Sequence, residues 1–193
     1  SPSAFNPHNR RKKTRKSSGK ARLTGRQWQR AIGLISSERC LVPGGVVSLN
    51  RMMGKLKILF LCTGNSCRSQ MAEGWARHLK SDSVQAFSAG LEAHGLNLNA
   101  VRVMQEAGVD ITDQKSQKVE EVETIPFDFV ITVCGHADEN CPVFSCATTV
   151  VHHGFDDPPK LAQTAKTEEE ALDHYRRVRD EIRTFVATLP EIL

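Results

Sequence analysis

Long apolar segments and a regular cysteine framework are both missing from this 193-residue sequence. No run of about 18 or more apolar residues occurs, so the sequence predicts no transmembrane helix and no membrane partner. The six cysteines are too few and too irregularly spaced for a small secreted disulfide scaffold. In an intracellular protein such cysteines are more often catalytic or metal-binding.

Acidic residues are almost absent from the first quarter of the chain. Residues 1–51 hold 12 lysines and arginines and one acidic residue, Glu38, which gives them a formal charge of +11. The remaining 142 residues carry −7, so the overall charge of +4 is the sum of two parts whose charges have opposite signs. We therefore divide the chain into a basic extension, residues 1–54, and one domain, residues 55–193.

The basic extension shows no periodic pattern of apolar residues. The run from Asn9 to Lys20, NRRKKTRKSSGK, is basic and contains serine, which favours disorder. We interpret the extension as dispensable sequence ahead of a start at Met52 or Met53. A transit peptide and a nucleic-acid-binding arm are the alternatives, because both share this composition. The sequence does not decide among them, although we do not expect a nucleic-acid partner.

From Lys57 onward, strand-like and helix-like segments alternate. Short apolar runs such as KILFL (57–61) and FDFVITV (127–133) are typical of strands buried on both faces. Thr167 and Glu170 form a capping-box pattern at the start of a long final helix. The alternation predicts a three-layer α/β fold, a four-stranded parallel sheet with helices on both faces. We expect strands at 57–61, 84–88, 127–133 and 148–151, and helices at 69–80, 98–107 and 167–189.

Chemically useful side chains follow the ends of three of these predicted strands. Cys62 follows the first strand, Cys134 follows the third, and the stretch from His152 to Asp157 follows the fourth. Ligands of open parallel sheets bind at the carboxyl ends of the strands. The sequence therefore predicts a functional site at this edge of the sheet.

The segment Cys62–Arg68, CTGNSCR, joins the first strand to the first helix through a glycine-containing loop. In such a loop, backbone N–H groups converge on an anion beside the positive end of the helix. Arg68 adds a bidentate group suited to a tetrahedral oxyanion. The same field is expected to stabilise Cys62 as a nucleophilic thiolate, to which Ser69 can donate a hydrogen bond. A buried cysteine in a structural turn is the non-catalytic alternative.

These residues resemble a known family. The loop and the later Asp-Pro step match the low-molecular-weight tyrosine phosphatases and the thioredoxin-coupled arsenate reductases related to them. The segments CTGNSCRSQMAEGWARH and GFDDP are specific to the arsenate reductases, and the resemblance covers residues 57–193. It implies the phosphatase-like fold and the reduction of arsenate to arsenite in arsenic detoxification. The residues implied to bind the oxyanion are Thr63, Gly64, Asn65, Ser66, Cys67, Arg68 and Ser69.

The resemblance also implies five catalytic residues, which are Cys62, Arg68, Cys134, Cys141 and Asp157. Cys62 attacks arsenate, and Asp157 of the Asp-Pro step protonates the leaving oxygen. Cys134 then attacks Cys62 and releases arsenite, and Cys141 resolves the resulting disulfide. Thioredoxin reduces the Cys134–Cys141 bond, so neither a cofactor nor a metal is implied. We further expect a monomer in the cytoplasm.

Other interpretations of these residues stay open. Asp156 is an alternative acid, and an Asp-Pro step also fits an ordinary turn. The two downstream cysteines also fit buried structural positions, or a zinc site shared with the histidines near them. Cys67 is interpreted as structural, and Cys40 and Cys146 as bystanders.

A phosphatase is the alternative enzyme, and an oxyanion- or redox-sensing module is the non-enzymatic alternative. Tyrosine-specific members of the family place aromatic residues after the Asp-Pro step, whereas Pro159, Lys160 and Leu161 follow it here. This difference favours a small inorganic oxyanion. The ordered cysteines and Asp157 favour turnover over sensing.

Two further expectations concern an ion and a motion. Some relatives bind a monovalent cation, and Asn65, Glu73 and Ser88 match that site, but Gln117 lacks the charge that those relatives place near it.

Residues seven apart on a helix are separated by ~10 Å along its axis, whereas a disulfide needs Cα atoms within about 7 Å. The segment from Cys134 to Cys141 must therefore be looped already or unwind during the reaction.

Overall fold

The computed structural model describes residues 54–144 and 147–193. Residues 1–53 of the predicted basic extension, and with them Cys40, lie outside the described residues, as does Cys146. None of the helices within the described ranges is long and apolar enough to cross a membrane.

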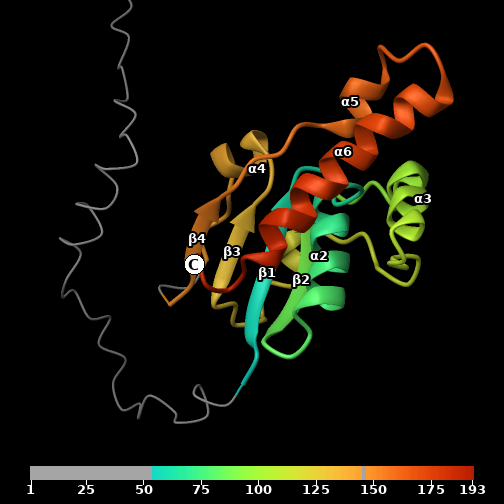
Figure 1. Cartoon of the computed structure of the whole chain (residues 1–193). Coiled ribbons are helices and arrows are strands. Elements are labelled where there is room, and N and C mark those ends of the chain that lie inside the picture. Colours follow the sequence, from blue (N-terminus) through green and yellow to red (C-terminus); the bar gives the residue numbers. More distant parts are fainter. Residues whose placement is uncertain (1–53, 145–146) are drawn as a thin grey trace, which may run out of the picture. The chain divides into compact units, whose positions relative to one another are not determined.

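Four parallel strands form one sheet in the order β2-β1-β3-β4 (Figure 1). Residues Ile58 to Leu61 of the central strand are fully buried, which explains why this strand is apolar on both faces. The register pairs Cys62 with Gly90, so the two strands end at the same edge of the sheet. The strands are β1 Leu56–Cys62, β2 Val84–Gly90, β3 Phe129–Thr132 and β4 Thr149–His152.

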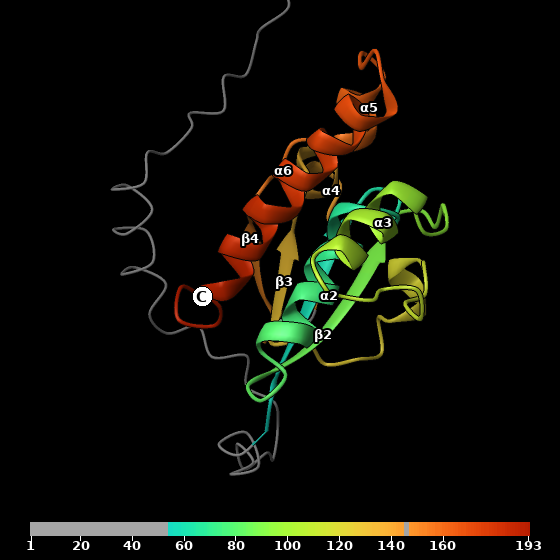
Figure 2. The ribbon, with the colours of Figure 1, turned by 45° about the vertical axis from the view of Figure 1, so that its right-hand side comes forward.

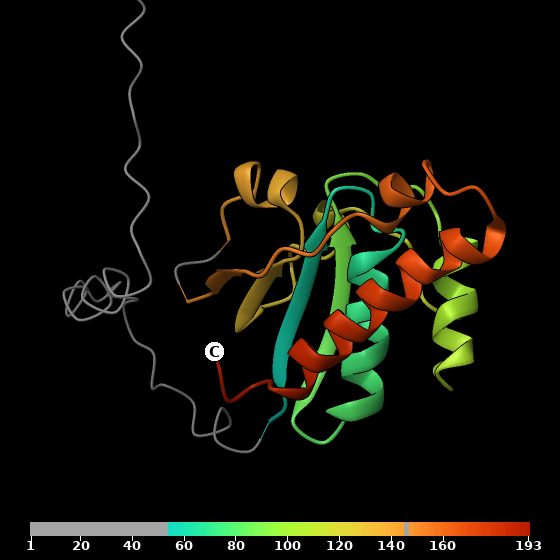
Figure 3. The same ribbon diagram turned by 45° about the horizontal axis from the view of Figure 1, so that its top comes forward.

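Helices lie on both faces of this sheet. α2 and α6 contact each other on one face, and α3 packs beside α6 (Figure 2). α4 contacts β1 and β3 on the other face (Figure 3). The predicted α/β fold, with a four-stranded parallel sheet and helices on both faces, is confirmed. The helices are α2 Arg68–Leu79, α3 Leu98–Glu106, α4 Gly135–Glu139, α5 Pro158–Ala162 and α6 Glu168–Ala187, with a 3-10 helix η2 at Val119–Glu121.

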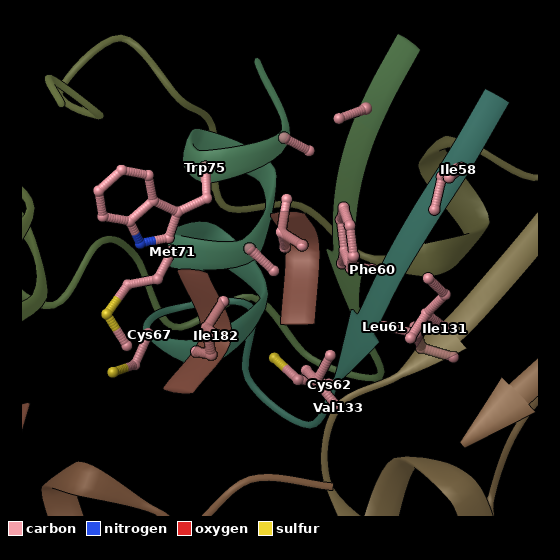
Figure 4. Packing of buried hydrophobic residues seen from close by; sticks show 14 of the residues in the cluster. Ile58, Phe60, Leu61, Cys62, Cys67, Met71, Trp75, Ile131, Val133 and Ile182 are labelled. Atoms are coloured by element: carbon pink, nitrogen blue, oxygen red, sulfur yellow. The ribbon is translucent and has the colours of Figure 1, made fainter. Parts of the chain in front are cut away.

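Large apolar side chains fill the space between the sheet, α2 and α6 (Figure 4). Phe60 of β1, Met71 and Trp75 of α2, and Ile182 of α6 are each no more than 2% exposed. The burial of each such side chain contributes roughly 1.5–3 kcal/mol to folding. This packing holds the start of α2 against the end of β1, where the candidate site lies.

Local signals explain where two of the helices begin. The Thr167 hydroxyl accepts the Glu170 N–H at 3.1 Å, as the predicted capping box requires. The Glu170 carboxylate, however, accepts from the N–H of Lys166, one residue earlier than in a capping box. α5 begins at Pro158, whose ring suits the first helical position. The sequence predicts neither α4 nor α5, because five residues are too few to show a helical period.

Candidate active site

The loop between β1 and α2 surrounds the Cys62 thiol at the carboxyl edge of the sheet. Cys62 is the last residue of β1, and Figure 4 shows it at the end of that strand, beside Val133. Its Sγ lies 2.9 Å from Ser69 Oγ and accepts the backbone N–H of Asn65 at 3.1 Å. The thiol is therefore buried under the loop, with hydrogen-bonding groups on either side of it.

The carbonyl groups of the loop are held by a neighbouring segment. Backbone N–H groups of residues 91–97 donate, at 2.8–3.1 Å, to the carbonyl oxygens of Cys62, Thr63, Gly64 and Ser66. In a trans peptide the following N–H points to the opposite side, so the N–H groups of residues 63, 64, 65 and 67 face inward. The N–H of residue 65 donates to Cys62 Sγ, which shows that this inner side is the thiol side.

The inward N–H groups make the loop an anion site. Within the part of the chain that the structure describes, the N–H groups of Thr63, Gly64 and Cys67 donate no hydrogen bond. Buried backbone donors are nearly always paired, so these are available to a bound anion. The N-terminal end of α2 adds its positive dipole at the same place.

Asn65 holds the loop in a conformation that few residues adopt. Its φ is 44°, which is in the left-handed region that asparagine tolerates better than most residues. The Nδ2 group donates to the hydroxyls of Ser69 and Ser88 at 3.0 and 2.9 Å. Its Oδ1 accepts from the Gln117 N–H at 2.8 Å and from Gln70 Nε2 at 3.0 Å. Asn65 thus fixes both the loop and the hydroxyl of Ser69.

The environment of Cys62 acts on its pKa in two directions. Burial raises the pKa of the Cys62 thiol above its ordinary value. The hydrogen bonds from Ser69 and from the Asn65 N–H, together with the charge of Arg68, work against that rise. The sequence-based expectation of a stabilised thiolate did not include this burial. Ser69 therefore matters because it limits the rise.

Replacing Ser69 with alanine should slow the reaction of Cys62 with iodoacetamide at neutral pH. A hydrogen bond to a charged group contributes about 1.5–3 kcal/mol, so we expect a loss of roughly tenfold or more at pH 7. Without that bond the pKa of Cys62 rises further, so the rate should recover as the pH is raised. The exposed Ser83→Ala variant is the matched control, and equal alkylation profiles for Ser69→Ala and the unmodified protein would contradict this role.

Arg68 and Asp157 form an ion pair at the edge of the loop. Arg68 Nη2 lies 3.2 Å from Asp157 Oδ1, and its Nη1 donates to the Phe155 carbonyl at 3.0 Å. Asp156, the alternative acid, instead lies 2.8 Å from Arg177. The structure therefore brings Asp157, and not Asp156, to the arginine that begins α2.

Residues 57–192 match the family described as low molecular weight phosphotyrosine protein phosphatase. The chain belongs to this family. An arsenate reductase of Halalkalibacterium halodurans is 48% identical over 139 residues, which are 72% of this chain and 98% of that protein.

Solved structures of the same fold are also similar to this member of the family. An arsenate reductase in the phosphate binding state is 31% identical with a TM-score of 0.56, over 69% of this chain and 95% of that one. An arsenate reductase in oxidized state is 30% identical with a TM-score of 0.58, also over 69% of this chain and 95% of that one.

A second thiol lies beside the loop in this family member. Cys134 follows β3 and is 4% exposed, and its Sγ lies 3.4 Å from Thr63 Oγ1. The Val133 N–H donates to the Leu61 carbonyl at 2.9 Å, which brings the ends of β3 and β1 together. Cys134 is close enough to Cys62 to contribute to the raised pKa of that thiol.

Cys141 is separated from Cys134 by the short helix α4. Cys134 precedes the helix and Cys141 follows it, partly buried. The first turn of the helix is formed by a hydrogen bond in which the Asp138 N–H donates to the Cys134 carbonyl at 3.1 Å. Burial and, to a smaller extent, the charge of Asp138 raise the pKa of Cys141. The four cysteines within the described residues are free thiols.

Cys67 lies in the loop but on its core side. It is 4% exposed, and Figure 4 shows it next to Met71, below Trp75. Burial is the largest cause of its strongly raised pKa. This position fits a structural role. The zinc alternative finds no support here, since no group of three or more potential ligand side chains gathers in residues 54–144 and 147–193.

Sequence reasoning missed the residues that hold the loop from outside. A Cβ on Gly90 would lie 2.3 Å from the Glu92 carbonyl oxygen and 2.7 Å from the Asn65 nitrogen, so only glycine fits. Gln114 Nε2 donates to Gln70 Oε1 at 2.6 Å and so orients the side chain that binds Asn65. A glycine at the end of a strand, which often marks a close backbone approach, was the one available signal.

Glu73 and Ser88, which were compared above with a cation site, have partners within the protein. Burial raises the pKa of Glu73, and Arg77 lies 2.9 Å from its carboxylate. The Gln117 side chain donates to the Ser88 carbonyl at 3.0 Å. A positively charged side chain thus accompanies Glu73 in this protein.

Proposed function

We propose that this chain reduces arsenate to arsenite with the thiols of Cys62, Cys134 and Cys141. The observation that carries the proposal is the pair of additional thiols, one beside the anion loop and one beyond α4. Hydrolysis of a phosphate ester uses neither of them, whereas a two-electron reduction without a cofactor needs both. The similarity to the arsenate reductase of H. halodurans supports the same substrate.

The first step joins Cys62 to the arsenic atom. The inward N–H groups and Arg68 hold the arsenate oxygens, as they would hold phosphate. The Cys62 thiolate attacks arsenic(V), and Asp157 protonates the oxygen that leaves, so that water departs. The contact between Asp157 and Arg68 supports this role, because it brings the carboxyl group to the loop. The carboxyl group must carry a proton when the oxygen leaves, and it gains that proton when the arsenate oxygens replace it as the partner of Arg68.

The second and third steps move the electrons. The Cys134 thiolate attacks Cys62 Sγ, a disulfide forms, and the electron pair of the broken sulfur–arsenic bond stays on arsenic. Arsenite therefore leaves as arsenic(III). Cys141 then attacks Cys134 and frees the Cys62 thiolate. A dithiol donor, for which we propose thioredoxin, reduces the Cys134–Cys141 disulfide and is itself oxidised to a disulfide.

We propose that α4 opens for the third step. Cys134 precedes its first residue and Cys141 lies two residues beyond its last, so the helix stands between the two thiols that must meet. Asp138 and Glu139 within the helix are exposed, and Pro142 follows it, so only a short turn is lost on opening. The opened segment would present the disulfide to a partner thiolate.

Oxidation should therefore increase hydrogen exchange in residues 134–146, while the four strands and the anion loop stay protected. The reason is that the backbone hydrogen bonds of α4 break when the two sulfur atoms meet. The measurement compares fully reduced protein with protein oxidised by one equivalent of arsenate. Equal protection of residues 134–146 in both states would argue against the opening of α4.

Further proposals follow from this chemistry. A thiol relay operates where thiols are kept reduced, so we propose a cytoplasmic location, with no cofactor or resident metal. We also propose that the protein acts as a monomer, because the described loop, Arg68, Asp157 and the cysteines all come from one chain. Residues 1–54 are proposed to be an extension outside the catalytic domain of residues 55–193.

Arsenate-dependent oxidation of NADPH in the presence of thioredoxin and thioredoxin reductase tests the function directly. We expect turnover with thioredoxin and little with a glutaredoxin system. A second arm measures hydrolysis of a phosphotyrosine peptide, because the family includes phosphatases and the loop binds a tetrahedral oxyanion. Efficient hydrolysis without arsenate-dependent NADPH oxidation would replace the proposed reductase with a phosphatase.

A further inference from the structure

His136 of α4 is linked to the second thiol, Cys134, through the hydroxyl group of Thr63 in the loop. His136 Nδ1 lies 3.4 Å from the Thr63 hydroxyl oxygen, and that oxygen lies 3.4 Å from Cys134 Sγ. His136 is exposed, whereas Cys134 is buried. Thr63 thus stands between a buried thiol and an imidazole that is open to solvent.

The second step of the proposed function requires the loss of a proton. A thiol is a weak nucleophile, so Cys134 must become a thiolate before it attacks Cys62. Its buried position leaves it little contact with water. Imidazole is the side chain that exchanges protons near neutral pH, and contacts of this kind are often long before the substrate is bound.

We propose that His136 accepts, through the Thr63 hydroxyl, the proton that Cys134 loses when it attacks Cys62. This inference rests on the proposed arsenate reduction. The Thr63 hydroxyl passes its own proton to His136 Nδ1 and takes the proton of Cys134. The sulfur–sulfur bond forms, the sulfur–arsenic bond breaks, and arsenite departs with the electron pair. The exposed imidazolium then returns its proton to solvent.

His136 is a positioning and proton-accepting residue, because it acts through Thr63 and not on the reacting sulfur itself. The other titratable groups nearby have different partners. Arg68 acts on Cys62, and Asp138 of the same helix lies 3.6 Å from His152 of β4. His136 is the group in the described residues that contacts the Thr63 hydroxyl from the α4 side.

A single-turnover experiment isolates this step. The full-length reduced protein is mixed with excess arsenate and no thioredoxin, and arsenite is measured by rapid quench between about pH 5.5 and 8.5. His136→Asn keeps a polar atom near the position of Nδ1 but cannot accept a proton. His136→Ala, with and without added imidazole, is the second variant, and His78→Asn on the exposed end of α2 is the matched control.

We expect arsenite release by His136→Asn to be at least about tenfold slower at neutral pH, because a positioned general base typically contributes more than this. The fall in rate on the acid side of the profile should weaken or disappear in this variant, because asparagine cannot take up a proton. Imidazole should partly restore the His136→Ala variant. The alkylation rate of Cys62, a separate readout, should not change in either variant.

The outcomes separate this inference from the proposed function. Release of arsenite by His136→Asn with the same rate and pH profile as the unmodified protein would overturn the role of His136 and leave arsenate reduction intact. Failure of the unmodified protein to release any arsenite would overturn both. His136→Asn could also be slower at every pH by the same factor, with no rescue of His136→Ala by imidazole. That result would overturn proton transfer as well, since it indicates a structural effect.

Discussion

Replacing Cys141 with serine should abolish multiple turnover with thioredoxin while arsenite is still released once per protein molecule. The Cys62–Cys134 disulfide then forms but has no third thiol to resolve it, and Cys134 is too buried for a partner thiolate to reach. Arsenate-dependent NADPH oxidation measures the loss, and a quenched single turnover measures the remaining arsenite. Cys62→Ser and Cys134→Ser should abolish turnover as well, Cys62→Ser before any sulfur–arsenic bond forms.

The controls for this prediction are Cys40→Ser and Cys146→Ser, which should turn over as the unmodified protein does. Peptide mapping of the Cys141→Ser variant after arsenate should find the Cys62–Cys134 disulfide. Turnover of Cys141→Ser at the unmodified rate would mean that thioredoxin attacks the first disulfide directly, and the three-thiol relay would be wrong.

Replacing Asp157 with asparagine should lower kcat for arsenate reduction by about 10²–10⁴-fold, which is the usual contribution of a general acid. Asparagine has nearly the same shape but cannot protonate the leaving oxygen. The ion pair with Arg68 places Asp157 at the loop, so the loss should fall mainly on kcat. Initial rates at saturating and limiting arsenate separate kcat from kcat/KM.

Asp156→Asn is the matched control, because it is the same change one residue away. Asp156 pairs with Arg177 on α6, and both side chains are largely exposed, so we expect little effect on either constant. A larger loss of kcat in Asp156→Asn than in Asp157→Asn would reverse the assignment of the acid.

The strands and long helices could be predicted because their signals are local. The apolar run at residues 57–61 became β1 Leu56–Cys62, and the Thr167–Glu170 pattern marked the start of α6. Periodicity needs length, however, so the five-residue α4 was not visible in the sequence. The predicted strand at 127–133 shortened to Phe129–Thr132, because β3 pairs only where β1 and β4 lie beside it.

The sequence by itself indicated the anion loop, because a strand, a glycine-containing loop and a helix start follow one another in one short segment. The roles predicted for the three cysteines and the Asp-Pro step came from the resemblance to the family. Only the tertiary structure showed which acid meets Arg68, and that residues 91–97 turn the loop N–H groups toward Cys62. It also showed that burial raises the pKa of Cys62. These features depend on contacts between residues far apart in the chain, and on the exclusion of water, which no local pattern encodes.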